Sequence, residues 1–110
     1  MALEAVAAVD EIALRLPRLR LYLTDQLMRA GLSIVLNLRE GAAEYSPAEK
    51  SRFYRIAYRS IAECEGGIDV GERLRLVPGM ELREARSRLA HLGVRVHNLI
   101  KRDLPARPDH

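Results

Sequence analysis

Cysteine, aromatic residues and long apolar runs are scarce in this sequence. Its 110 residues include one cysteine, Cys64, five aromatic residues and no tryptophan. One cysteine cannot form an internal disulfide, and no apolar run approaches the ~20 residues with which a helix crosses a bilayer. These absences argue against a disulfide-stabilised secreted domain and against a membrane protein.

A secretory signal peptide is also not recognisable in the first 16 residues. Such a peptide has a cationic start followed by a compact apolar stretch. Here four charged residues interrupt the Ala, Val and Leu pattern: Glu4, Asp10, Glu11 and Arg15. Together with the single cysteine, this predicts a protein of a bacterial-type cytoplasm with no membrane partner.

Strand signals are nearly absent as well. The sequence shows no sustained alternation of apolar and polar residues and no Asn-Gly or Asp-Gly hairpin turn. With 48% apolar and 30% charged residues, it has the composition of a soluble globular protein, and its length allows one domain. We expect an all-α domain over residues 1–104 and a flexible tail over residues 105–110.

Helical periodicity is strong where strand signals are missing. One apolar stripe advances by steps of three and four, as on one face of a helix: Leu82, Ala85, Leu89, Leu92, Val96 and Leu99. This helix is expected to start after the Pro78-Gly79 turn and to end before Pro105. Similar patterns predict a first helix over residues 3–16 and a second helix between residues 17 and 45.

The third helix has an explicit start. Ser46 begins a capping box with Pro47 at the first helical position, so its hydroxyl should accept from the Glu49 amide while the Glu49 carboxylate reaches back. We expect the helix to run to about Leu76, with Phe53 facing the core. Four helices joined by short turns predict an antiparallel up-down-up-down four-helix bundle.

The centre of the second helix gives a first indication of an oligomer. Residues 30–36, with the sequence AGLSIVL, are apolar almost all the way round the expected helix. A helix without a polar face must be covered on more than one side. In a domain of this size, that predicts a subunit interface in addition to the internal core.

The middle of the chain also resembles a known family. Its characteristic residues have specific spacing across two helices and their turn, and they follow the segment YLTDQLMRAGLSIVLN: Asn37, Glu40, Gly41, Ser46, Phe53, Ile56, Ala57, Ser60 and Glu63. Over about residues 16–75 the sequence is similar to the 23S rRNA intervening-sequence proteins. It departs from the usual family pattern at four positions: Val35, Arg39, Ala43 and Glu44.

The resemblance implies an antiparallel four-helix subunit that assembles into a ring-like homopentamer, with no known catalytic residues and no cofactor. A related branch, the accessory variability determinant of diversity-generating retroelements, has a similar bundle and pentamer. That branch binds nucleic acid through a basic surface and partners a reverse transcriptase. The acidic Glu44, where relatives tend to be basic, weakens the case for phosphate binding at the turn before the third helix.

Arginine supplies the candidate binding residues, since the chain has sixteen Arg and only two Lys. The guanidinium group forms two-pronged hydrogen bonds with phosphate. Two stripes follow from helical spacing, one on the third helix and one on the fourth: Arg52, Arg55 and Arg59, and Arg88, Arg95 and Arg102. The alternatives are a solvated face with ion pairs to Glu49 or Glu63, and an arginine content that only reflects a GC-rich genome.

Other polar and reactive residues favour structural interpretations. Tyr54 and Tyr58 could stack on bases beside the arginines, but packing against a neighbouring helix or subunit accounts for them better. Glu40 and Glu63 could form an acid–base pair, yet no histidine partner or phosphate cradle completes such a site. Polar groups of the family-like motif, Asn37 and Ser60 included, are better explained as hydrogen bonds that fix helix register.

Cysteine and histidine give no metal-binding pattern. Cys64 lies on the apolar side of the third helix, as a small buried hydrophobe would. His91 and His97 are six residues apart, so they do not share a face as a zinc pair at four-residue spacing would. We therefore expect no metal and no cofactor.

Taken together, these features predict a non-enzymatic homo-oligomer that binds RNA or DNA through arginine-rich surfaces without strong sequence preference. The alternative is a protein-interaction scaffold, for example for a polymerase or reverse transcriptase, that does not itself contact nucleic acid.

Overall fold

A computed structural model describes residues 1–102, apart from the side chains of Met80 and Glu81. The predicted tail, residues 105–110, and the last two residues of the predicted domain lie outside this part. Four α-helices and one 3-10 turn make up the described chain: α1 Ala2–Arg15, η1 Arg18–Arg20, α2 Leu21–Ala43, α3 Pro47–Arg73 and α4 Gly79–Arg102. Residues 1–102 contain no strand, so the all-α prediction is confirmed for them.

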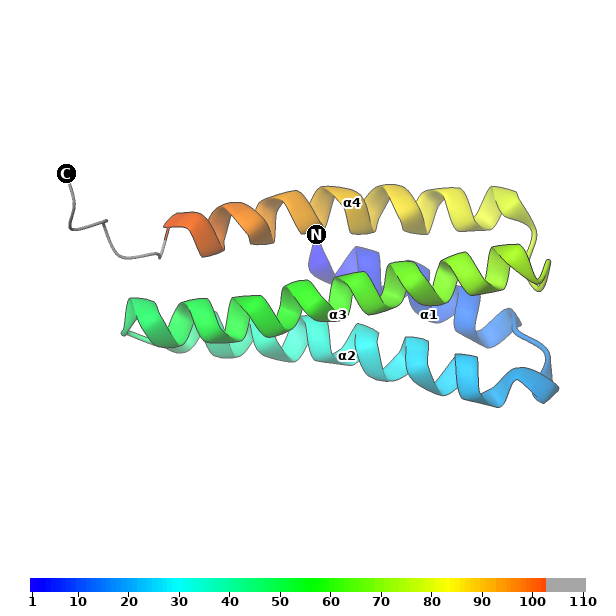
Figure 1. Ribbon diagram of the computed structural model, residues 1–110, viewed down its shortest axis with the longest axis horizontal. Helices are drawn as coiled ribbons and strands as arrows, with labels where there is room; N and C mark the ends of the chain where they lie inside the picture. Colours follow the sequence, from blue (N-terminus) through cyan, green and yellow to red (C-terminus); the bar gives the residue numbers. More distant parts are fainter. Residues whose placement is uncertain (103–110) are drawn as a thin grey trace.

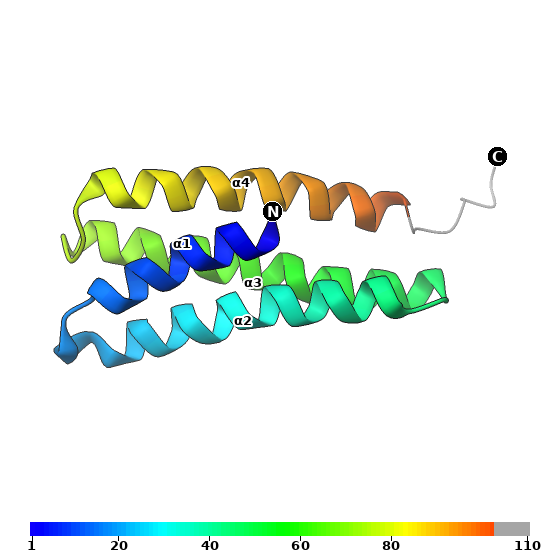
Figure 2. The same ribbon diagram turned by 180° about the vertical axis from the view of Figure 1, so that it is seen from behind.

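The helices lie side by side along the long axis of the molecule (Figure 1). The α1–α2 and α3–α4 connections lie at one end, and the α2–α3 connection lies at the other. Helix α1 packs against α2 and α4, and α3 packs against the same two helices. Because α1 is short, its N-terminus lies near the middle of the bundle (Figure 2).

The apolar stripes form one core between the four helices. On α4, Leu82, Ala85 and Leu89 are buried, as are Leu92 and Val96, while the last predicted member of the stripe, Leu99, is half-buried. Val9 and Ile12 of α1, Leu27 and Ile34 of α2, and Ile68 of α3 complete the interior. No helix in the described chain has an apolar stretch long enough to span a membrane.

Helix α3 starts as predicted at Ser46. The Ser46 hydroxyl accepts from the Glu49 amide at 3.4 Å, with Pro47 in the first helical position. The Glu49 carboxylate does not reach back to the Ser46 amide, as the expected capping box would require. It accepts instead from Arg52 Nε at 3.0 Å. A serine cap of this kind stabilises a helix by about 1 kcal/mol.

Helix α3 ends three residues earlier than expected, at Arg73. Two hydrogen bonds close its end, from the Leu76 amide to the Gly71 carbonyl at 2.9 Å and from the Arg75 amide to the Glu72 carbonyl at 3.0 Å. This is a Schellman motif, which requires a left-handed residue after the helix. Arg75 takes that conformation, with φ of 56°, where glycine is the usual residue.

Candidate nucleic-acid interface

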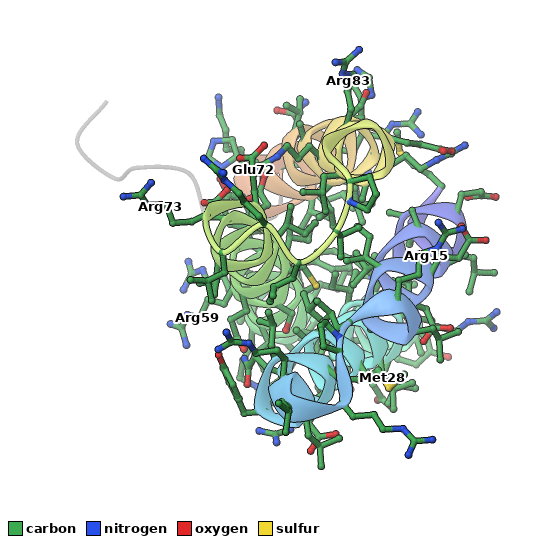
Figure 3. The ribbon with its side chains drawn as sticks, turned by 90° about the vertical axis from the view of Figure 1, so that its right-hand side faces the viewer. Arg15, Met28, Arg59, Glu72, Arg73 and Arg83 are labelled. Atoms are coloured by element: carbon green, nitrogen blue, oxygen red, sulfur yellow. The ribbon has the colours of Figure 1, made fainter. Side chains whose placement is uncertain are left out.

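The predicted stripe on α3 is exposed to solvent. Arg52, Arg55 and Arg59 all have exposed side chains, and in the end-on view Arg59 points outward from α3 (Figure 3). Arg52 is engaged, since it bonds Glu49 and its guanidinium carbon lies 4.4 Å from the ring centroid of Phe53. Arg55 and Arg59 have no hydrogen bond or ion pair within residues 1–102. Those two guanidinium groups are therefore open to a phosphate ligand.

The arginines of the predicted stripe on α4 make more contacts within the chain than those on α3. Arg88 forms an ion pair with Glu84 at 3.0 Å, and Arg95 Nη1 lies 3.5 Å from the sulfur of Met1. Arg102, in the last turn of α4, is exposed and also has an interaction within the chain. The α4 stripe thus offers a less open cationic surface than Arg55 and Arg59 do.

The structure does not bring the two stripes together. The contact of Arg95 with Met1 places the α4 stripe on the flank that faces α1. The α3 stripe lies nearer α2, because its neighbour Glu63 accepts from Gln26 of α2 at 2.7 Å. One chain therefore presents the two predicted stripes on different sides of the bundle.

A polar network joins α2 to α3. Ser60 Oγ donates to Ser33 Oγ at 2.8 Å, and Asn37 Nδ2 donates to the Ser33 carbonyl at 2.9 Å and to its hydroxyl at 3.1 Å. Ser60 is buried, and the other two are half-buried. The Ser60 bond crosses from α3 to α2, as the register-fixing interpretation expects, whereas both bonds of Asn37 stay within α2. Sequence reasoning did not identify Ser33.

The two glutamates of the motif are exposed rather than buried. Glu63 nevertheless accepts a hydrogen bond from Gln26 of α2, whereas Glu40 forms no hydrogen bond or ion pair within residues 1–102. Phe53 is also only half-buried, contrary to its expected place in the core. The buried aromatic residue is its neighbour Tyr54, which is 5% exposed.

Gly41 of α2 leaves the space that the ring of Tyr54 occupies. A Cβ placed on Gly41 would lie 2.5 Å from Cε1 of the Tyr54 ring, so only glycine leaves room for the ring against α2. Packing against a neighbouring helix, as predicted, is therefore confirmed for Tyr54. Tyr58 is 41% exposed and lies against His97 of α4, with 5.8 Å between the ring centroids.

Cys64 is fully buried, as predicted. Burial raises the pKa of its thiol to about 12, and the negative charges of Glu63 and Glu65 act in the same direction. A thiol of this kind stays protonated at neutral pH, which makes it a poor nucleophile. Within the described residues, no group of three or more His, Cys, Asp or Glu side chains is arranged to hold a metal ion.

The structure also reveals arginines that sequence reasoning did not single out. The segment Arg-Leu-Arg-Leu occurs at residues 18–21 and again at residues 73–76. The two segments lie in different connections, at the same end of the bundle (Figure 1). Their repetition was a visible signal, but only the fold shows that they lie at the same end of the bundle.

Comparison with known proteins agrees with this architecture. A family model described as 23S rRNA-intervening sequence protein matches residues 1–98, which is most of the chain. The match extends beyond the two central helices to α1 and to nearly all of α4. No curated protein sequence matches the chain.

Proposed function

The chain belongs to the 23S rRNA-intervening sequence protein family, and we propose that it is a non-enzymatic homo-oligomer that binds RNA or DNA through its arginine-rich surfaces. The observation that carries this proposal is the exposed pair Arg55 and Arg59, which has no partner within residues 1–102. Such guanidinium groups bind backbone phosphates without reading the base sequence. The single buried cysteine is consistent with a reducing, cytoplasmic setting.

Repetition of the subunit would strengthen binding through individually weak contacts. We propose an antiparallel up-down-up-down bundle that assembles into a ring-like homopentamer, in keeping with the family resemblance. In a ring, each arginine stripe occurs five times, and a bound strand can contact several subunits at once. The separation of the α3 and α4 stripes on one subunit then matters less, because stripes of neighbouring subunits can share a ligand.

A fluorescence anisotropy titration with labelled RNA and DNA oligonucleotides tests the binding. We expect affinity that falls steeply between about 50 and 200 mM salt, as phosphate contacts require. The variant Arg55→Gln/Arg59→Gln should reduce the slope of log K against log salt by about 1.4, that is, about 0.7 for each phosphate of a single strand that is no longer neutralised. Arg29→Gln/Arg39→Gln on α2 is the charge-matched control. No binding by the unaltered protein at low salt would refute the function.

Exposed apolar residues on α2 support the proposed assembly. Leu32 and Leu36 are 58% and 53% exposed, and Met28 lies on the same side of the helix. Light scattering should give about five times the 12.4 kDa chain mass. Leu32→Glu/Leu36→Glu should lower the measured mass, whereas Leu14→Glu, on α1, should leave it unchanged. A stable monomer of the unaltered chain would contradict the ring.

A protein scaffold is the second candidate function. An apolar groove beside the N-terminus of α1 favours it, because Val35, Leu38 and Ala42 of α2 line the groove together with Leu3. Such a groove suits an apolar segment of a partner such as a polymerase. Partner binding that survives nuclease and high salt, and that Leu38→Glu abolishes, would favour the scaffold over direct nucleic-acid binding.

A further inference from the structure

The end of the bundle that carries the α1–α2 and α3–α4 connections is strongly basic. We name it the turn end and define it as residues 15–22 and 73–83. These two segments contain one acidic residue, Glu81, and six arginines: Arg15, Arg18, Arg20, Arg73, Arg75 and Arg83. Their charge excess is larger than the net charge of +3 for the whole chain. By contrast, the connection at the opposite end, residues 43–50, holds two glutamates and one lysine.

The arginines of the turn end point outward from several elements. The end-on view shows Arg15, Arg73 and Arg83 spread around this face, on α1, α3 and α4 (Figure 3). Arg18, Arg73, Arg75 and Arg83 are exposed, and none of these four has a hydrogen-bond or ion-pair partner within residues 1–102. The nearby acidic residues Asp69 and Glu72 are already bonded to Arg86, at 2.6 and 2.8 Å. The charges of these four arginines are therefore not compensated by an ion pair within residues 1–102.

Helix dipoles account for only part of this cluster. A cation in the last turn of a helix is stabilised by the helix dipole, which explains Arg15 of α1 and Arg73 of α3. The same dipole disfavours cations near a helix start. Yet Arg18 and Arg20 directly precede α2, and Arg83 lies just after the first turn of α4. Arg20, directly before α2, therefore stands where the helix dipole disfavours a cation, and the dipole gives no reason for Arg18 or Arg83.

Arg75 conflicts with its local structure in a second, independent way. Its φ of 56° is a left-handed conformation, which the Cβ of any residue other than glycine makes costly. Glycine would satisfy the same Schellman motif at a lower conformational cost. Residues that break a local rule without a structural gain are expected at functional sites. Arg75 thus points to a role that depends on its charge.

The accompanying side chains favour nucleic acid among anionic ligands. Arg20 Nη1 donates to the Tyr22 hydroxyl at 3.3 Å, which holds an aromatic ring at the edge of the basic face. Tyr22 is 59% exposed and Leu19 is 93% exposed. Arginine binds phosphate with two hydrogen bonds, and an exposed aromatic ring offers a surface on which a base can stack. This combination is typical of single-strand binding surfaces.

We infer that the turn end binds single-stranded RNA or DNA, with its arginines on consecutive phosphates and Tyr22 stacked on a base. The inference rests on the proposed nucleic-acid function and assigns it a surface other than the α3 and α4 stripes. The bundle is 23 by 20 Å across, a width that about four or more nucleotides can cover.

A charge-matched comparison tests the inference. The variant Arg18→Gln/Arg73→Gln removes one arginine from each of the two segments of the turn end. Arg29→Gln/Arg39→Gln removes two exposed arginines of α2 outside the turn end. With a labelled single-stranded oligonucleotide at low salt, we expect the turn-end variant to bind about tenfold more weakly. Its salt slope should fall by about 1.4, as when two phosphates are no longer neutralised. The control variant should lose less than about threefold in affinity, because it changes only the overall charge of the protein.

Separate outcomes distinguish the inference from the proposed function. If the unaltered protein binds no oligonucleotide, the proposed function fails. If it binds and the turn-end variant matches the control, or only Arg55→Gln/Arg59→Gln weakens binding, the inference is wrong while the proposed function stands. Binding of vesicles with anionic lipid, without binding of oligonucleotide, would also overturn the inference. Circular dichroism should show that each variant stays helical.

Tyr22 gives a second test that does not depend on charge. Tyr22→Ala should weaken binding of a single-stranded oligonucleotide about fivefold or more, because a base can no longer stack there. Tyr22→Phe keeps the ring and should retain most of the affinity. Tyr45→Ala is the matched control, since Tyr45 is 98% exposed at the opposite end of the bundle. Equal effects of Tyr22→Ala and Tyr45→Ala would exclude stacking at the turn end.

Discussion

The ring of Tyr54 lies so close to Gly41 that a single added carbon would overlap it. A Cβ on Gly41 would be 2.5 Å from Cε1 and 2.7 Å from Cδ1 of that ring. Both residues are buried near the turn that joins α2 to α3. The glycine of the family-like motif thus allows an aromatic side chain of α3 to pack directly against the α2 backbone.

Gly41→Ala should therefore destabilise the protein, although alanine is the better helix former. Overpacking a buried contact costs roughly 1–3 kcal/mol, against about 1 kcal/mol gained in helix propensity. We expect a net loss of up to about 2 kcal/mol in the free energy of unfolding, measured by urea denaturation. Gly66→Ala is the control, because nothing lies within 4 Å of its added Cβ, and it should gain about 1 kcal/mol. Equal gains at both glycines would contradict the packing argument.

Most of the fold could be predicted from helical periodicity, but the orientation of the third helix could not be fully predicted. The stripe on α4 and the capping serine of α3 are both present in the structure. The error concerned Phe53, which was expected in the core and is only half-buried. It lies 100° from Tyr54 on the helix, so either aromatic residue could face the core. The choice depends on Gly41 of another helix, a partner that the pattern of one helix does not reveal.

The candidate site was less predictable than the fold for a similar reason. Spacing along one helix correctly predicted that Arg55 and Arg59 would be exposed together. It could not show that the α3 and α4 stripes lie on different sides of the bundle. Nor could it show that residues 18–21 and 73–76 are at the same end. Those relations depend on how the helices pack and where their connections fall.

The Ser60–Ser33 hydrogen bond should contribute to the pairing of α2 with α3. Ser60→Ala leaves the Ser33 hydroxyl without its buried donor, and we expect a loss of about 1 kcal/mol in the free energy of unfolding. The double variant Ser33→Ala/Ser60→Ala should cost less than the sum of the two single variants, because each single change removes the same bond. Ser87→Ala, at an exposed position of α4, should be neutral. Strict additivity in this cycle would argue against a stabilising bond.

Cys64 should make stability fall in alkaline solution. Burial raises the pKa of its thiol in the folded state from an ordinary 9.0 to about 12. Above pH 9 the unfolded chain releases this proton while the folded chain keeps it, so the unfolded state binds fewer protons. The free energy of unfolding should then fall by about 1.4 kcal/mol per pH unit between pH 9 and 12.

Comparison with Cys64→Ala isolates this effect from the ionisation of other groups. The difference in stability between the two proteins should shrink as the pH rises through that range, and a constant difference would contradict the shifted pKa. In the folded protein at pH 8, the thiol should also react with an alkylating reagent only as fast as the chain opens.

Arg75 should be a residue at which stability and binding oppose each other. Arg75→Gly relieves the left-handed strain of about 1–2 kcal/mol. Part of this gain in stability is lost, because glycine gives the unfolded chain more conformational freedom. We expect a net gain of about 0.5–1 kcal/mol, measured by urea denaturation. Arg75→Lys keeps both the charge and the strain, so it should leave stability nearly unchanged and weaken oligonucleotide binding less than Arg75→Gly does. If Arg75→Gly is more stable and binds as well as the unaltered protein, the charge at this position has no part in binding.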